Sequence, residues 1–237
     1  MTLRALIVDD EPYSREEIAA MLQETGEFVV VGKCADALEA LRTLRREKPD
    51  VLFLDVQMPV INGFELIGMI DEELMPSVVF VTAHDQYAIK AFEENALDYL
   101  LKPVEQERLL KTVEKLRKRG GAAEKPVFTP PEIRKIPCIQ SSRIKLIDTA
   151  DVEVVRSDEA GVHVGYAGGE LYTDLTLQTL ETKTGLVRCH KQFLINMDRV
   201  DEILLRENMV AEIRTKSGRL VPVSRRYLRL LREKLHF

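Results

Sequence analysis

Five polar residues in the first half of the chain are of types that handle phosphate and divalent cations, and they stand at the ends of short apolar segments. They are Asp9, Asp10, Asp55, Thr82 and Lys102. Clustered carboxylates repel one another unless a cation is present, and their oxygens suit Mg²⁺. A carboxylate beside that ion can attack a phosphoryl group and form an aspartyl phosphate, while an ammonium and a hydroxyl stabilise the phosphoryl oxygens. Brought together, these residues would accept a phosphoryl group.

The apolar segments before these residues have the composition of buried parallel strands. The predicted strands are Leu3–Val8, Val29–Gly32, Val51–Leu54, Val78–Val81 and Leu97–Leu101. An Asp after a single strand is usually a turn former. Polar residues at the ends of several strands favour a shared site instead, because ligands of parallel sheets bind outside the carboxyl ends of the strands.

Helical signals separate the predicted strands. Ser14 and Glu17 have the spacing of a capping box, which predicts a helix that begins at Ser14, and Asp36 with Glu39 predicts the start of a second helix. The segment Glu105–Arg119 carries an apolar stripe at helical spacing. Strands that alternate with helices predict an α/β, doubly wound, parallel five-stranded sheet covered on both faces.

Four motifs in this half occur in a characteristic order. They are Asp9-Asp10-Glu11-Pro12, Leu54-Asp55-Val56-Gln57-Met58-Pro59 with Gly63, Thr82-Ala83, and Tyr99-Leu100-Leu101-Lys102-Pro103. Together they resemble the receiver domain of response regulators, and the resemblance covers residues 1–119.

The resemblance implies a role for each matching residue. Asp55 would be the phosphoacceptor, and the Mg²⁺ ligands would be Asp9, Asp10, Asp55 and Gln57, the last through its backbone carbonyl. Thr82 and Tyr99 would be the switch residues and Lys102 the phosphate-pairing ammonium, with a cis bond to Pro103. For Tyr99, a tyrosine packed at the end of a strand is the alternative interpretation.

Charge divides the chain of 237 residues. Residues 1–119 carry 15 Lys and Arg against 23 Asp and Glu, whereas residues 120–237 carry 19 against 16. From Arg214 to Phe237 there are eight basic residues and one acid. The length favours two domains. The basic half could face a polyanion, or its charge run could be a solvated helix face.

The sequence has no feature of a secreted or membrane protein. No stretch approaches the ~20 uncharged apolar residues of a membrane span, and the N-terminus lacks the layout of a signal peptide. The three cysteines, Cys34, Cys138 and Cys189, lack the spacing of a disulfide framework or a zinc site. These features predict a cytoplasmic protein.

Glycines and prolines without apolar periodicity mark residues 120–136 as a linker. Beyond it, residues 137–237 contain short apolar segments separated by turn residues, as at 167–169 and 216–218. Two helical patches are predicted, Leu175–Thr182 and Tyr227–Leu235. The second domain is therefore predicted to be mostly β, which argues against a helix-turn-helix output.

Catalytic chemistry finds little support in the second half. It has no Gly-rich phosphate loop and no nucleophile motif. Cys189 and His190 could suggest a nucleophile and its base, but adjacent residues of a strand point to opposite faces. We therefore expect Cys189 to be buried and His190 exposed, and we expect no enzymatic output.

The basic residues of the second half suit contacts to phosphates and bases. The segment Val187–Asn196, Ile203 and the segment Leu220–Tyr227 resemble the LytTR DNA-binding domain, over residues 137–237. The resemblance implies DNA contacts from His163, Arg188, His190, Lys191, Ser224, Arg225 and Arg226. For Arg225, an ion pair with Glu202 or Glu233 is the alternative.

A receiver followed by a LytTR domain resembles a response regulator of the LytR/AlgR type. Such a protein would be phosphorylated on Asp55 by a sensor histidine kinase, of the LytS type by resemblance. It would then dimerise through the helices 87–94 and 105–118 and bind double-stranded promoter DNA to regulate transcription. The alternative is a receiver that controls an RNA-binding or protein-binding output.

Overall fold

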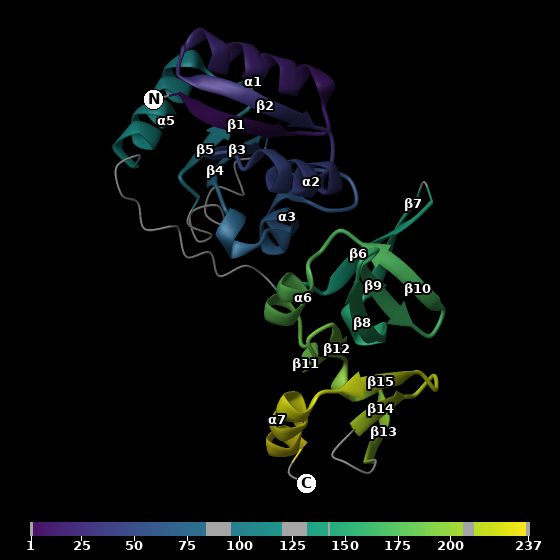
Figure 1. Ribbon diagram of the computed structural model, residues 1–237. Coiled ribbons are helices and arrows are strands. Elements are labelled where there is room, and N and C mark those ends of the chain that lie inside the picture. The colour runs from purple at the N-terminus through teal and green to yellow at the C-terminus, as the bar shows by residue number, and fades with distance from the viewer. Residues whose placement is uncertain (1, 84–95, 120–131, 142, 206–210, 236–237) are drawn as a thin grey trace. The chain divides into compact units, whose positions relative to one another are not determined.

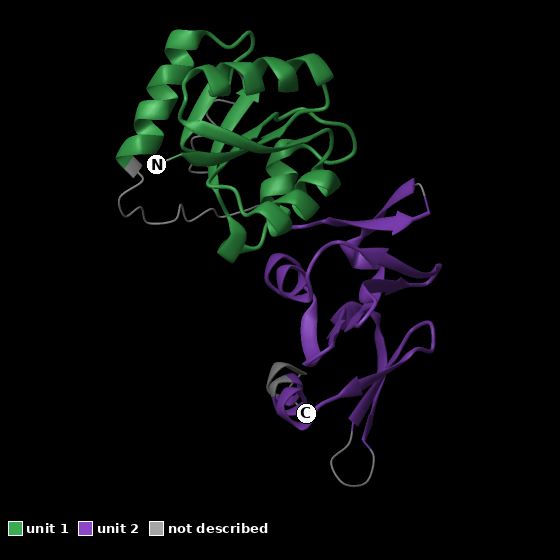
Figure 2. Cartoon of the chain, turned by 45° about the horizontal axis from the view of Figure 1, so that its top comes forward, with its two compact units in different colours: residues 1–131 green, residues 132–237 purple. Residues whose placement is uncertain are grey.

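The computed structural model describes residues 2–83, 96–119, 132–141, 143–205 and 211–235 (Figure 1). They form two compact units, Met1–Pro131 and Glu132–Phe237 (Figure 2). None of the described helices is long and apolar enough to cross a membrane.

The first unit is built on a five-stranded parallel sheet in the order β2-β1-β3-β4-β5. Its strands are β1 (Leu3–Val8), β2 (Phe28–Cys34), β3 (Val51–Leu54), β4 (Ser77–Thr82) and β5 (Asp98–Leu101). The central strands β3 and β4, and β1 from Ala5 onward, are almost wholly buried because both faces of the sheet are covered. The predicted α/β fold is confirmed.

Helices flank this sheet. They are α1 (Pro12–Glu24), α2 (Ala37–Glu47), α3 (Gly63–Met69), a short 3-10 helix (Glu72–Leu74) and α5 (Gln106–Arg119). One core joins α1 and α5 to the sheet, with Ile18 and Leu22 of α1 and Leu109 and Val113 of α5 packed in it. Helix α2 packs against β1, β2 and α3. The predicted helix 87–94 lies outside the described residues.

The predicted capping box at Ser14 is wrong. Helix α1 begins at Pro12, and its N-cap, Glu11, makes no side-chain cap. Proline suits the first helical position because its φ is preset and its missing N–H would be unpaired there. Ser14 therefore lies inside the first turn, and its hydroxyl donates a charge-assisted hydrogen bond to Asp9 Oδ2 at 2.6 Å. The cap predicted at Asp36 is present.

The second unit contains two antiparallel sheets. The larger has the order β11-β12-β8-β9-β10-β6-β7 and the smaller the order β13-β14-β15. The strands are β6 (Lys135–Gln140), β7 (Arg143–Asp148), β8 (Val152–Asp158), β9 (Gly161–Tyr166), β10 (Gly169–Thr173), β11 (Val187–His190), β12 (Phe193–Ile195), β13 (Val200–Leu205), β14 (Ala211–Thr215) and β15 (Leu220–Val223). The mostly-β prediction is confirmed.

Helices also pack against strands of this unit. Helix α6 (Leu177–Lys183) packs on β8 and β12, and α7 (Arg225–Leu235) packs on β11. Two short 3-10 helices, Thr149–Asp151 and Met197–Arg199, connect strands. One core contains Val154 and Cys189 of the larger sheet, Ile213 of the smaller sheet and Leu228 of α7.

Several element boundaries differ from their predicted positions, and two of these differences bear on the linker and on the basic residues. Strand β6 begins at Lys135, inside the segment predicted as a linker, and Ile133 is already buried. The neighbouring prolines and charges obscure this short apolar start in the sequence. Helix α7 begins at Arg225 rather than Tyr227, so Arg225 and Arg226 lie in its first turn.

Candidate functional site

The parallel ladder brings the predicted phosphoacceptor site together at the carboxyl ends of the strands. The backbone N–H of Asp55, just past β3, donates to Val8 O of β1 at 2.8 Å. The N–H of Lys102, just past β5, donates to Thr82 O of β4 at 2.9 Å. Residues 47 positions apart in the sequence, Asp55 and Lys102, are thereby held in one place.

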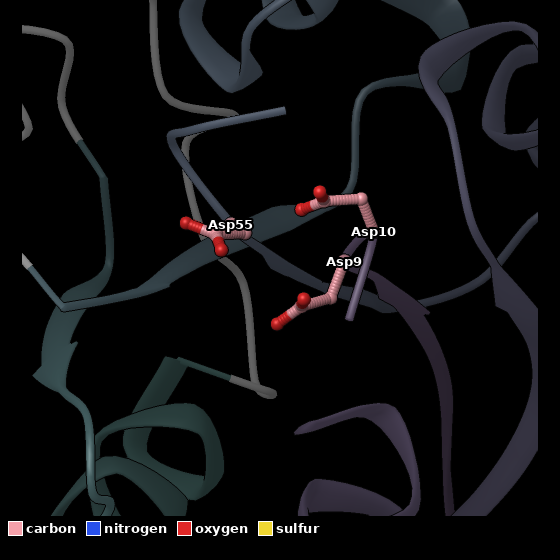
Figure 3. A group of neighbouring side chains, drawn as sticks. All are labelled: Asp9, Asp10 and Asp55. Carbon is pink, nitrogen blue, oxygen red and sulfur yellow. The ribbon is translucent and has the colours of Figure 1, made fainter. Parts of the chain in front are cut away.

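Three carboxylates converge at this edge. Asp9, Asp10 and Asp55 place one oxygen each within 4.8 Å of the others, and Figure 3 shows their side chains together. Asp9 and Asp55 are buried, whereas Asp10 is more open to solvent. The backbone N–H of Gln57 donates to Asp55 Oδ1 at 3.1 Å, which orients the carboxylate.

Lys102 supplies a cation to this cluster. Its Nζ lies 2.8 Å from Asp55 Oδ2 and 2.7 Å from Asp9 Oδ2, and its side chain is only 16% exposed. Burial by itself would lower the pKa of Lys102, but the hydrogen bonds to Asp55 and Asp9 outweigh burial and raise the pKa. The ammonium therefore stays charged. The bond from Lys102 to Pro103 is cis, as the sequence motif implies.

Thr82 ends β4 beside these charges. Its side chain is fully buried, and its Oγ1 has no hydrogen-bond partner among the described residues. A buried hydroxyl without a partner costs stability, so this oxygen suits a group that binds at the site. Tyr99, the other predicted switch residue, lies partly buried in β5.

The charges of the cluster fit a divalent cation. The three clustered carboxylates offer the hard oxygens that Mg²⁺ takes as ligands. Glu11 Oε2 also lies 3.7 Å from Lys102 Nζ, so the carboxylates outnumber the nearby cations, Lys102 and Arg15, and leave an excess of negative charge. Asp9, Asp10 and Asp55 would hold the ion. The Gln57 carbonyl remains a predicted fourth ligand.

The residues that fix Asp9 were missed from the sequence. Ser14 donates to its carboxylate, the Glu11 N–H donates to Oδ1 at 2.9 Å, and the Arg15 guanidinium donates to its backbone carbonyl at 2.5 Å. The only signal was the presence of a hydroxyl five residues after Asp9, and that residue was assigned to a helix cap.

A second charged cluster, also missed, joins β5 to α5. Asp98 accepts hydrogen bonds from Arg108, Thr112 and Lys115. Burial alone would raise the pKa of Asp98, but these bonds outweigh it and hold the pKa well below its usual range. Arg108 also donates to the Tyr99 carbonyl at 3.0 Å, so the cluster ties α5 to the strand of the predicted switch residue.

In the second unit, two of the predicted basic segments lie side by side. The N–H of Ser224 donates to Cys189 O at 3.0 Å, which brings the start of α7 next to the turn between β11 and β12. Lys191, on that turn, is exposed, and so are Arg225 and Arg226 at the start of α7. His190 is partly exposed and its Nδ1 accepts from the Gln192 N–H at 3.2 Å.

Two predicted DNA-binding residues lie in less accessible places. His163, in β9, is 19% exposed, and its Nδ1 is buried without a hydrogen-bond partner among the described residues, 4.0 Å from Asp158. Arg188, in β11, is 14% exposed and paired with Glu181 of α6. Glu202, a suggested partner of Arg225, pairs with Arg214.

The interpretation of Cys189 and His190 as a catalytic pair does not fit the structure. Cys189 is fully buried, and burial raises the pKa of its thiol to about 12. A thiol in that state supplies little thiolate, which is the nucleophilic form. Cys189 packs as an apolar side chain.

Comparison with known proteins gives two matches to family models and several long relatives. Residues 5–114 match the response regulator receiver domain, and residues 142–236 match the LytTr DNA-binding domain. A response regulatory protein of Vibrio vulnificus, itself described as uncharacterized, is 53% identical over 237 residues and covers 98% of both chains. The transcriptional regulatory protein BtsR is 49% identical in Salmonella typhi and 47% identical in Escherichia coli, over 234 residues and 98% of both chains. The chain therefore belongs to the response regulators that join a receiver domain to a LytTR DNA-binding domain, a family of transcriptional regulators.

Proposed function

We propose that a sensor histidine kinase phosphorylates Asp55, and that phosphorylation controls binding of the second unit to promoter DNA. The observation that carries the first step is the surroundings of Asp55. A buried carboxylate lies beside two further carboxylates and a partly buried ammonium, next to a hydroxyl that has no partner among the described residues. This set suits the charges and oxygens of a phosphoryl group.

In the proposed reaction, an Asp55 carboxylate oxygen attacks phosphorus and the bond to the donor histidine nitrogen breaks. Mg²⁺, held by Asp9, Asp10, Asp55 and the Gln57 carbonyl, would neutralise charge on the phosphoryl oxygens. Lys102 would pair with one phosphoryl oxygen, and Thr82 would donate a hydrogen bond to another.

The proposed consequence is dimerisation through the face that contains β5 and α5. Thr82 would move towards the phosphoryl group and Tyr99 would follow. Leu101 of β5 and Leu110 of α5 are large apolar side chains that are 47% and 46% exposed, so both elements offer apolar surface to a partner. A dimer would present two DNA-binding units to promoter DNA in the cytoplasm. By resemblance, the kinase would be of the LytS type.

On the DNA side, we propose contacts from His190, Lys191, Ser224, Arg225 and Arg226, because the turn after β11 and the start of α7 adjoin and expose basic groups. Arginine can read guanine with two hydrogen bonds, whereas lysine anchors phosphates. The match to a DNA-binding domain favours duplex DNA over the RNA-binding or protein-binding alternative.

The test combines labelling with a mobility shift. The full chain is incubated with acetyl phosphate and Mg²⁺, labelling is measured, and binding to fragments of its own promoter region is followed with and without the phosphodonor. We expect labelling on Asp55 and tighter binding after it. Labelling at another residue would contradict the proposal. So would a DNA affinity that is the same with and without labelling.

A further inference from the structure

The side chain of Arg188 makes three hydrogen bonds inside the protein. Its Nε donates to Glu181 Oε2 at 2.9 Å, its Nη2 donates to the same oxygen, and its Nη1 donates to the backbone carbonyl of Lys191 at 3.1 Å. The side chain is 14% exposed, whereas that of Glu181 is 37% exposed. The guanidinium is therefore engaged on both sides, by an acid and by a carbonyl.

These bonds connect a helix to the turn that presents Lys191. Glu181 lies in α6, Arg188 in β11, and Lys191 begins the tight turn between β11 and β12. Helix α6 packs on β8 and β12, so the backbone that carries Glu181 is held in place. The guanidinium thus connects this anchor to the Lys191 carbonyl of the turn.

Further bonds hold the same turn. The Gln192 N–H donates to His190 Nδ1, so in the neutral ring the proton lies on Nε2. The Ser157 N–H of β8 donates to Gln192 O at 2.8 Å. Backbone and ring are thus held, while the ammonium of Lys191 stays exposed.

We propose that Arg188 is a positioning residue for DNA binding rather than a DNA contact. Anchored by Glu181, it holds the Lys191 carbonyl and so fixes the turn from which His190 and Lys191 face the DNA. Ordering a turn on binding costs free energy, and a turn already held avoids that cost. This inference rests on the proposed DNA contacts of the turn.

The two roles predict opposite effects of Glu181. If Arg188 bound a phosphate directly, Glu181 would compete for the guanidinium, and Glu181→Gln would tighten DNA binding. If Arg188 holds the turn, Glu181 is its anchor, and Glu181→Gln weakens binding even though it removes a negative charge. The sign of the effect therefore separates the roles.

The experiment measures the affinity of the full chain for a fluorescent duplex taken from its own promoter region, by anisotropy. Glu181→Gln is expected to weaken binding about 5- to 10-fold, the difference in strength between a charge-assisted hydrogen bond and the neutral one that Gln can still accept. The control is Glu202→Gln, which removes the same charge from the pair with Arg214. An affinity of Glu181→Gln equal to or above that of Glu202→Gln would overturn the inference.

A comparison with combined variants tests whether Arg188 affects DNA binding through the turn. Arg188→Gln should weaken binding in the wild-type chain, and most of that loss should vanish when His190 and Lys191 are both already Ala, because the turn presents both side chains. An equal loss in both backgrounds would mean that Arg188 acts independently of these two side chains, and would overturn the inference. A chain with both His190→Ala and Lys191→Ala that binds as tightly as wild type would overturn it too. Melting temperatures within a few degrees of wild type confirm that the variants fold. A wild-type chain that bound no promoter duplex would contradict the proposed function itself.

Discussion

The two units use charge in opposite ways. In the receiver, Asp9 and Asp55 are buried and both bond to Lys102, which is itself largely shielded from solvent. In the DNA-binding unit, Lys191 and Arg225 are exposed, on a turn and on the first turn of a helix. Buried charges interact strongly because water does not screen them, but they tolerate no loss of a partner. Exposed charges are individually weak and act by summation on a polyanion.

This difference predicts that single substitutions are decisive in the receiver and graded in the DNA-binding unit. The largest effect is expected for Asp55→Asn, which is nearly isosteric and removes the nucleophile. Labelling by acetyl phosphate should be abolished while the fold is retained, as checked by circular dichroism. Residual labelling at the wild-type rate would assign the acceptor elsewhere.

The next largest effect is expected for Asp10→Asn, which removes the most open carboxylate of the cluster. Loss of a group that merely orients a metal ligand costs about 10–100-fold in affinity, and a direct ligand should cost at least as much. A Mg²⁺ titration, followed by labelling rate and by a spectroscopic signal of binding, measures it. A titration that overlays the wild type would make Asp10 a turn residue.

Asp98→Asn tests a second buried carboxylate of the receiver, one that lies outside the predicted phosphoacceptor site. Loss of its charge-assisted hydrogen bonds to Arg108 and Lys115 should lower the free energy of unfolding by about 2 kcal/mol at pH 7. Glu114→Gln, the same charge change at an exposed position of α5, should be near neutral.

The Asp98 effect should depend on pH with a defined sign. Its pKa is lowered in the folded chain, so its contribution is fully present above the unfolded value of about 4 and is lost as the pH falls. Urea denaturation of variant and wild type should therefore differ at pH 7 and converge towards pH 2. A difference that grew on acidification would contradict the assigned direction.

A graded effect is expected in the DNA-binding unit for Arg225→Ala. Loss of a bidentate contact to guanine should cost about 1–3 kcal/mol and relax preference at one base pair. Affinities for a promoter fragment and for a scrambled duplex of equal length check this. If Arg225 serves only the fold, the melting temperature falls and the ratio of the two affinities stays at its wild-type value.

The smallest effect is expected for Lys191→Ala, the loss of one exposed phosphate anchor. Binding to both duplexes should weaken by similar factors, and the slope of log affinity against log salt should fall by about one unit. A change confined to the promoter fragment would show that Lys191 reads a base.

Much of this protein is determined by short-range sequence pattern. Apolar segments such as Leu3–Val8 and Val51–Leu54 predict buried parallel strands, and the order of the strand ends then requires Asp9, Asp55 and Lys102 to meet. The physical reason is that a parallel sheet aligns the carboxyl ends of its strands at one edge, however far apart they are in the chain.

Other features depended on partners that only the tertiary structure brings near. Ser14 has the spacing of a helix cap, but the folded sheet places the Asp9 carboxylate within its reach. Arg188 has the charge and the hydrogen-bond donors of a DNA contact, but packing of α6 places Glu181 beside it. Polar side chains bond the strongest partner within a few ångströms, and the identity of that partner is set by packing between distant segments rather than by local spacing. The sequence alone therefore determined which residues carry charge and where strands end, and the tertiary structure decided which of those charges remain available to a ligand.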